Sequence, residues 1–218
     1  MKKYLRQFVI VLLIIPCVVV LLAACGSNGN KFIYTYTKAF IDANLTGDFW
    51  VKYERTQGSS ITILITARKD ENWYQTQGGS EYLYLKEGNA YKVYEKKFSF
   101  ELMGFDWIYM PQYDSIITDL ITHPTEGIDT IYSAANMAVR YGAEIFKKVA
   151  ETTVLGRECI VFGPRDGDSD TRVTVDKETG ITMKITEAQS TSGGYGVVSV
   201  ICTEFLRGDA VSIPTIDL

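Results

Sequence analysis

The chain has 218 residues, with 22 Lys and Arg against 26 Asp and Glu, and a formal net charge of −4. Three of the basic residues and none of the acidic ones lie in residues 1–24, so residues 25–218 carry a formal charge of −7. This balance argues against nucleic acid or strongly anionic head groups as primary partners. A domain of this length can bury a substantial core without disulfide staples.

The first 25 residues follow the pattern of a bacterial lipoprotein signal. A positively charged start precedes the apolar run Phe8–Leu22, and the ending Leu22-Ala23-Ala24-Cys25 reads as a lipobox. We therefore expect cleavage before Cys25 and attachment of lipid to its sulfur. A helix of fifteen residues spans about 22 Å, which is short of a hydrocarbon core of about 30 Å. The alternative is an ordinary secretory signal or a short anchor, in which Cys25 is an incidental thiol.

This anchor sets the expected domain organisation and location. The two acyl chains of a diacylglyceryl group are what stable anchoring generally needs, and the small polar residues 26–30 suit a flexible tether. We predict a signal peptide at residues 1–24, a lipidated cysteine and tether at 25–31, and a single domain at 32–218. The predicted location is the extracytoplasmic face of the cell membrane.

Two cysteines, Cys159 and Cys202, belong to the predicted domain. An extracytoplasmic location permits a disulfide between them. Each lies in an apolar strand-like run, where a buried free thiol is equally ordinary. The sequence leaves both possibilities open.

The predicted domain opens with a helix and continues as strands. Apolar residues recur at three- and four-residue spacings over residues 32–45, which predicts an amphipathic helix. Alternating apolar and polar residues then predict strands, separated by segments rich in Gly, Asn and Asp, as tight turns require. Five such strands make a predicted antiparallel meander, at residues 49–54, 61–67, 72–77, 81–86 and 90–97.

The middle of the chain changes to a helical pattern. Pro111 opens a one-sided apolar pattern that closes at Pro124, and a second helix is predicted from Asp129 or Thr130 to Gly142. Strand patterns resume afterwards. The order of strands, two helices and further strands predicts an α+β domain with a large antiparallel sheet. Residues 145–153 fit either the last turns of a helix or a strand, and the later strands are predicted at 159–162, 173–175, 181–185 and 195–205.

No arrangement of residues marks a catalytic or metal site. His123 is the only histidine, and no Gly-x-Ser-x-Gly elbow is present. The segment Asp166–Asp170 resembles the start of a calcium loop, but Thr171 and Lys177 stand where such a loop needs glycine and a bidentate carboxylate. We expect no enzymatic activity, no metal and no cofactor.

Aromatic residues are unusually dense between residues 73 and 113. One interpretation is an apolar cavity between a curved sheet and its helices, with tyrosine hydroxyls near its mouth. The alternative is that these residues are the core and cross-strand ladder of a β-rich domain. The candidates for lining a ligand cavity are Trp73, Tyr82, Tyr84, Tyr91, Tyr94, Phe98, Phe100 and Trp107.

Two later segments carry a family resemblance. Val154–Val161, with its Leu-Gly-Arg-Glu-Cys run, and Val175–Ile185, with Val-Asp-Lys-Glu-Thr-Gly, resemble the C-terminal half of LolA/LolB-like lipoprotein-carrier domains. The resemblance covers most of residues 25–218 by order of elements, although its motifs are short. It implies a curved antiparallel sheet, an incomplete barrel, packed around two or three helices, with a hydrophobic cavity for acyl chains. No ligand-handling residue of the family matches a position here.

These observations predict a membrane-anchored bacterial lipoprotein that is not an enzyme. It would bind or transfer a hydrophobic ligand, either a lipid or an acyl chain, at the cell envelope. The alternative is an envelope protein-interaction or sensory module that uses the same fold without a ligand. Its expected partners are the membrane, through lipid on Cys25, together with such a ligand or an envelope protein.

Overall fold

The computed structural model describes residues 31–113, 130–142, 145–164, 170–191 and 194–216. The predicted signal, Cys25, most of the predicted helix between Pro111 and Pro124, and the aspartate-rich turn at 165–169 lie outside these residues. Phe32–Leu218 form one compact unit. No helix among the described residues is both long and apolar enough to cross a membrane.

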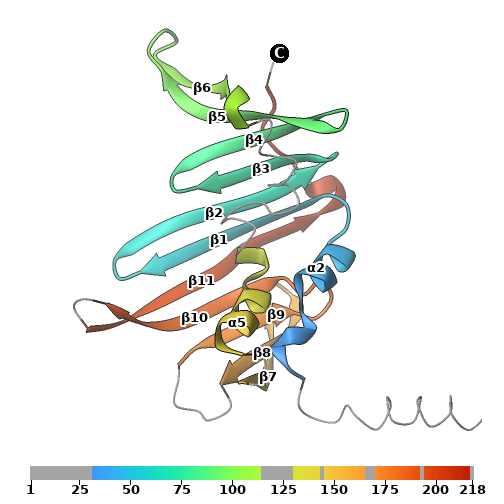
Figure 1. Cartoon of the computed structure of the whole chain (residues 1–218), viewed down its shortest axis with the longest axis vertical. Coiled ribbons are helices and arrows are strands. Elements are labelled where there is room, and N and C mark those ends of the chain that lie inside the picture. The colour runs from blue at the N-terminus through green and yellow to red at the C-terminus, as the bar shows by residue number, and fades with distance from the viewer. Residues whose placement is uncertain (1–30, 114–129, 143–144, 165–169, 192–193, 217–218) are drawn as a thin grey trace, which may run out of the picture. The chain divides into compact units, whose positions relative to one another are not determined.

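The structure is dominated by one antiparallel sheet of eleven strands (Figure 1). Their spatial order is β6-β5-β4-β3-β2-β1-β11-β10-β9-β8-β7, so the chain builds the sheet from β1 outward and returns to pair β11 with β1. The strands are β1 Phe49–Gln57, β2 Ser60–Lys69, β3 Asn72–Gln77, β4 Ser80–Glu87, β5 Ala90–Ser99, β6 Gly104–Tyr109, β7 Phe146–Val154, β8 Arg157–Pro164, β9 Arg172–Asp176, β10 Thr182–Thr191 and β11 Gly194–Arg207.

The five strands predicted for the meander are confirmed, with tight turns at the predicted Gly, Asn and Asp positions. The segment at 145–153, which the sequence left undecided, is strand β7. Strand β6 was not predicted. Its aromatic and apolar side chains stand at exposed as well as at half-buried positions, so its sequence shows no regular alternation of apolar and polar residues.

The helices are short. Helix α2 spans Lys38–Asn44 and is capped by Thr37, whose side chain accepts a hydrogen bond from the Phe40 amide at 3.2 Å. Helix α5 spans Ser133–Tyr141 and ends at Gly142, as predicted. Three 3₁₀ turns complete the described helical elements: η1 Ile33–Thr35, η2 Pro111–Tyr113 and η3 Gly208–Ala210.

The predicted fold class, an α+β incomplete barrel packed around two or three helices, is wrong. The described residues form one open eleven-stranded sheet whose end strands, β6 and β7, do not pair with each other. Helices α2 and α5, the two whose bounds fall within the described residues, have only seven and nine residues, and they lie beside the β8–β11 part of the sheet (Figure 1). Helices this short cover part of one face, so they cannot form a centre around which the sheet is wrapped.

Hydrophobic residues pack on both faces of the sheet. Phe49, Val51 and Tyr53 point from β1 into the larger cluster, which also contains buried residues of α2 and α5. Trp50 points the opposite way, as strand alternation requires, and packs against a smaller cluster. That smaller cluster is Ala67, Tyr74, Leu83 and Tyr94, and Ile213 and Ile216 of the C-terminal segment pack against it.

Candidate ligand cavity

An open cavity of about 640 Å³ lies between α5 and the helix-covered face of the sheet. Strands β1, β2, β10 and β11 supply its floor and one wall, and α5 supplies the other wall. Its lining residues are Arg55, Leu64, Thr130, Ser133, Asn136, Met137, Val139, Arg140, Ile185, Glu187, Val198 and Val200.

Thr182 on β10 fixes α5 above this cavity. The Ala134 amide, in the first turn of α5, donates a buried hydrogen bond to Thr182 Oγ1 at 3.2 Å. The Tyr53 hydroxyl donates to the Thr182 carbonyl at 2.9 Å. Because complete burial raises the Tyr53 pKa well above its usual value, this hydroxyl keeps its proton and stays a donor.

The cavity is apolar at its floor and polar at its rim. Ile185, Val198 and Val200 are buried on the sheet face. At the rim, the buried Glu187 accepts hydrogen bonds from Arg140 Nη1 at 3.1 Å and from the Tyr141 hydroxyl at 2.5 Å. The bond to Glu187 raises the pKa of Tyr141. An apolar floor with a few fixed polar groups is the usual character of a small-molecule site.

The eight predicted aromatic residues all lie outside this lining. Trp73 packs edge-on against Phe49, with ring centroids 5.7 Å apart. Tyr94 is buried in the smaller cluster, and Trp107 packs against that cluster. Phe98 is 44% exposed and lies near the β5–β6 turn. The remaining candidates are half-buried or exposed residues of the same meander, Tyr82, Tyr84, Tyr91 and Phe100.

The apolar residues that line the cavity were missed because each of them reads as ordinary core in the sequence, and the polar ones are scattered along the chain without a motif. Val198 and Val200 alternate on one face of β11, and Leu64 occupies the matching face of β2. Only the pairing of β1 with both β2 and β11 brings them together.

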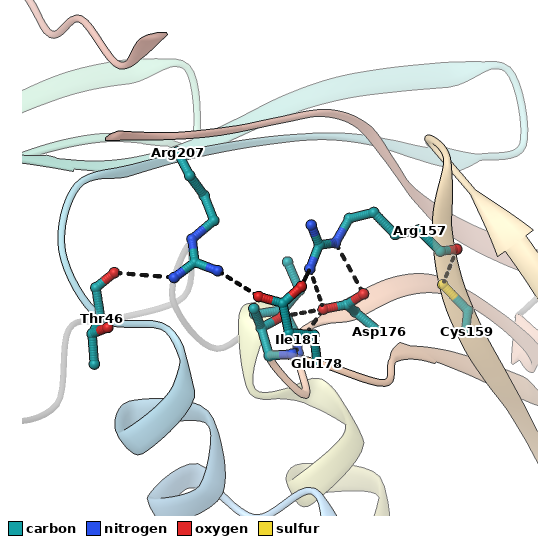
Figure 2. A network of polar contacts seen from close by, with 8 residues as sticks. Thr46, Arg157, Cys159, Asp176, Glu178, Ile181 and Arg207 are labelled. Atoms are coloured by element: carbon teal, nitrogen blue, oxygen red, sulfur yellow. Dashed lines mark hydrogen bonds and ion pairs between the residues drawn. The ribbon is translucent and has the colours of Figure 1, made fainter. Parts of the chain in front are cut away.

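The segments that carry the family resemblance form a polar network (Figure 2). Arg157 on β8 makes a bidentate ion pair with Asp176 on β9, at 2.9 Å to each carboxylate oxygen. Asp176 also accepts from the Thr179 amide at 2.8 Å and from its hydroxyl at 2.6 Å. Glu178 accepts hydrogen bonds from Arg157 Nη2 at 2.7 Å and from Arg207 Nη1 at 2.8 Å, and so links the two arginines. This network therefore fastens the turn after β9 to its neighbouring strands, and none of its residues lines the cavity.

Cys159 and Cys202 are buried free thiols in the structure. Burial raises the pKa of the Cys159 thiol to about 11 and that of Cys202 to about 12. Among the described residues, no group of three or more His, Cys, Asp or Glu side chains is placed to hold a metal ion.

Both thiols should resist iodoacetamide at pH 8 in the folded protein, because the thiolate is the reactive form and an ordinary thiol has a pKa of about 8.5. In the unfolded chain both thiols ionise at a lower pH than in the folded protein. The free energy of unfolding should therefore fall as the pH rises above about 8.5. Mass spectrometry after alkylation is the check: Cys159 and Cys202 should stay unmodified in the folded protein, and both should be modified in urea without reductant. Modification of both in the folded protein would contradict their burial, and protection of both in urea would instead show the disulfide that the sequence permits.

Replacing Thr182 by Val should loosen α5, because the Ala134 amide loses its buried acceptor. We expect a loss of about 1–3 kcal/mol in the free energy of unfolding, measured by urea denaturation. Faster hydrogen exchange at Ala134 should accompany it. Thr152→Val, at an exposed position on β7, is the control and should change stability by less than about 0.5 kcal/mol. Equal stability of the two variants would contradict the role of Thr182.

Comparisons with known proteins do not place the chain in a family. No family model and no curated protein matches it. Among solved structures, MucB in complex with MucA(peri) has 14% identity and a TM-score of 0.39, over 83% of this chain and 56% of that one. The Pseudomonas aeruginosa MucA/MucB complex has 15% identity and a TM-score of 0.36, over 80% of this chain and 56% of that one. A DUF1329 family protein from Desulfovibrio piger has 9% identity and a TM-score of 0.27, over 83% of this chain and 93% of that one.

The chain thus spans little more than half of the MucB-complex chains that it resembles. Likenesses this distant assign neither a family nor a function.

Proposed function

We propose that this protein is a lipid-anchored lipoprotein on the extracytoplasmic face of a bacterial membrane, which binds or transfers a hydrophobic ligand without catalysing a reaction. The observation that carries the proposal is the open cavity under α5. Its volume of about 640 Å³ falls in the range of about 300–1,000 Å³ typical of ligand sites. The lipobox and the resemblance to LolA/LolB-like carriers support the same conclusion.

The lining suggests how an acyl ligand would lie. Its chain would contact the apolar floor made by residues such as Ile185, Val198 and Val200. Its head group would stay at the open rim, near Arg55 and Arg140. Arg55, together with the Arg140–Glu187 ion pair, makes the rim polar, and the positive charge of Arg55 fits a ligand with an acyl chain and an anionic head, such as a fatty acid or an acidic phospholipid.

Native mass spectrometry with palmitic acid and with dipalmitoyl phosphatidylglycerol tests this proposal. One ligand should bind per chain. Asn136→Trp, at an exposed position of α5 that lines the cavity, should fill the opening and reduce the bound fraction at least tenfold. Ile201→Trp, on β11 next to the lining residue Val200 and on the opposite face of the sheet, should bind like the unmodified chain. Absence of any bound ligand, or equal binding by the two variants, would overturn the proposal.

A second candidate function, a protein-interaction module, is favoured by one feature. Large apolar side chains are exposed at the β5–β6 hairpin, away from the cavity: Phe98, Phe100, Leu102, Met103 and Phe105. Exposed apolar patches of this kind mark interaction sites in soluble domains. The two functions are compatible, because they use different parts of the sheet.

A further inference from the structure

The antiparallel order gives the sheet two ends, and each end carries its own set of turns. Because consecutive strands run in opposite directions, the β1–β2, β3–β4 and β5–β6 turns lie at one end of the sheet, which we call the β1–β2 end. The β2–β3, β4–β5, β7–β8 and β9–β10 connections lie at the other end, the β2–β3 end. Figure 1 shows the first three turns on the left of the sheet and the β2–β3 and β4–β5 turns on the right.

Large apolar side chains are exposed at the β1–β2 end. In the β5–β6 turn, Phe100 is 84% exposed and Met103 is 77% exposed, and Leu102 between them is exposed as well. Ile61, just after the β1–β2 turn, and Val197, near the start of β11, are also exposed. The antiparallel pairing of β11 with β1 places the start of β11 at this same end. Exposed apolar side chains gathered in this way mark a surface that meets a membrane or another protein.

The β2–β3 end is rich in ion pairs instead. Three of them join side chains beside its turns: Lys69–Asp48 at 2.9 Å, Lys86–Glu71 at 2.5 Å and Lys92–Glu87 at 2.9 Å. The network around Arg157 and Asp176 lies at this end as well, beside the turn after β9 (Figure 2). The domain therefore changes character along its strands, from exposed apolar side chains at one end to paired charges at the other.

The chain enters the domain at the β1–β2 end. Phe32 forms a bridge with Lys147, the second residue of β7. Phe146, the first residue of β7, pairs with Pro164 at the end of β8, and the strand order places this pair at the β1–β2 end. Residues 25–31, the predicted tether, span at most about 24 Å when fully extended. A lipid on Cys25 would therefore hold this end of the domain within that distance of a bilayer.

The polar rim of the cavity also lies toward the β1–β2 end. Arg55 is two residues from Gln57, the last residue of β1. Helix α5 begins beside Thr182, the first residue of β10, and its last turn reaches Glu187 further along that strand. A ligand that enters over this rim would therefore come from the side of the anchor. The described elements on either side of residues 114–129, η2 and the start of α5, belong to the other end.

We propose that the β1–β2 end is the surface by which the domain lies on the bilayer that holds its anchor, with Phe100, Leu102 and Met103 entering the interface. The inference rests on the proposed function, because the anchor is what selects a bilayer over another partner. The cavity rim then meets the lipid from which an acyl ligand is drawn. The formal charge of −7 on residues 25–218, with Asp166 and Asp168 in the connection from β8 to β9, favours a zwitterionic surface over an anionic one.

A protein tethered to vesicles through Cys25 tests this surface. The chain from residue 25, which retains the whole compact unit, is coupled to a maleimide phospholipid in phosphatidylcholine vesicles. Cys159 and Cys202 are buried and do not compete for the maleimide. Phe100→Trp places a reporter in the β5–β6 turn, and brominated acyl chains quench a tryptophan that enters the interface by about 5–10 Å. The added fluorescence, measured against the coupled chain without the substitution, should fall at least twofold.

Leu155, in the β7–β8 turn at the β2–β3 end, supplies matched controls. Leu155 and Met103 are both exposed and both have positive φ, +51° and +47°, a backbone conformation that aspartate tolerates. Leu155→Trp should keep its fluorescence on brominated vesicles. In the Phe100→Trp protein, Met103→Asp should restore most of the added fluorescence, whereas Leu155→Asp should leave the quenching unchanged.

Three results would overturn the proposal: no quenching of Phe100→Trp, quenching that survives Met103→Asp, or equal quenching of Leu155→Trp. A β5–β6 turn that binds only an envelope protein gives the first of these results. Because the coupling replaces natural lipidation, the outcome does not depend on whether Cys25 is lipidated in the cell or whether the cavity takes a ligand. Failure of either of those leaves the proposed function wrong and the docking surface tested separately.

Discussion

Replacing Arg157 by Met is expected to lower the free energy of unfolding by about 3 kcal/mol. The Asp176 side chain is only 1% exposed, and Arg157 is the cation that pairs with it through two hydrogen bonds of 2.9 Å (Figure 2). Removing one partner of a buried ion pair leaves a charge without compensation in a poorly solvated place, which commonly costs about 3–5 kcal/mol. We take the lower value because the Arg157 side chain is itself 21% exposed.

Urea denaturation followed by circular dichroism measures this loss. The control is Arg207→Met, which removes the other arginine that contacts Glu178 in the same network. Glu178 is 65% exposed, so this change should cost no more than about 1 kcal/mol. If the two variants were equally stable, the Arg157–Asp176 pair would not be the interaction that fastens the turn after β9 to strand β8.

Gly180→Ala should destabilise the fold by about 3 kcal/mol. Gly180 has φ +79°, a conformation that costs an L-residue about 1–2 kcal/mol. An added Cβ would also lie 2.8 Å from Cδ1 of Phe40 and 3.1 Å from Cγ1 of Ile41. Both are residues of α2, so the substitution would push the helix away from the turn that follows β9. Overpacking of this kind typically adds about 1–3 kcal/mol.

The matched control for this change is Gly88→Ala in the β4–β5 turn. Gly88 has φ +61°, but an added Cβ there would meet no atom within 4 Å. Its expected loss is therefore the conformational part alone, about 1 kcal/mol. Thermal or urea unfolding of both variants separates the two effects. An equal loss of unfolding free energy in the two variants would show that the close contact of residue 180 with α2 does not add to the cost of the substitution.

The sequence predicted the strands well because their alternation is a local signal. In β2, Ile61, Ile63 and Ile65 alternate with Thr62, Leu64 and Thr66, and turn residues set the boundaries on either side. The alternation located the strand but not its buried face, because Ile61 and Ile63 are exposed and Thr66 is buried. The order of strands is not local. Pairing of β1 with β11 joins segments roughly 150 residues apart, and no periodicity reports it. The fold class failed for this reason: strands and short helices were recognised, but their arrangement as one open sheet was not.

The eight aromatic residues predicted to line a ligand cavity lie outside the lining of the cavity described here. Aromatic density suggested a cavity beside β3–β6, whereas the cavity in the structure lies between α5 and strands β1, β2, β10 and β11. Aromatic residues are conspicuous in a sequence, while Val198, Val200 and Ile185 look like any buried strand positions. The feature that sets them apart is Thr182, which holds α5 above them through the Ala134 amide. That contact joins positions 48 residues apart and could not be read from either segment alone.

The most direct test of the central claim is to map where an acyl chain binds. Palmitic acid carrying a photoreactive diazirine can be irradiated with the protein, and the labelled peptides identified by mass spectrometry. We expect labels on α5, Ser133–Tyr141, and on the β11 residues around Val198 and Val200, and we expect unlabelled palmitic acid to reduce them. Labels confined to the β5–β6 hairpin, or labelling that unlabelled palmitic acid does not reduce, would contradict it.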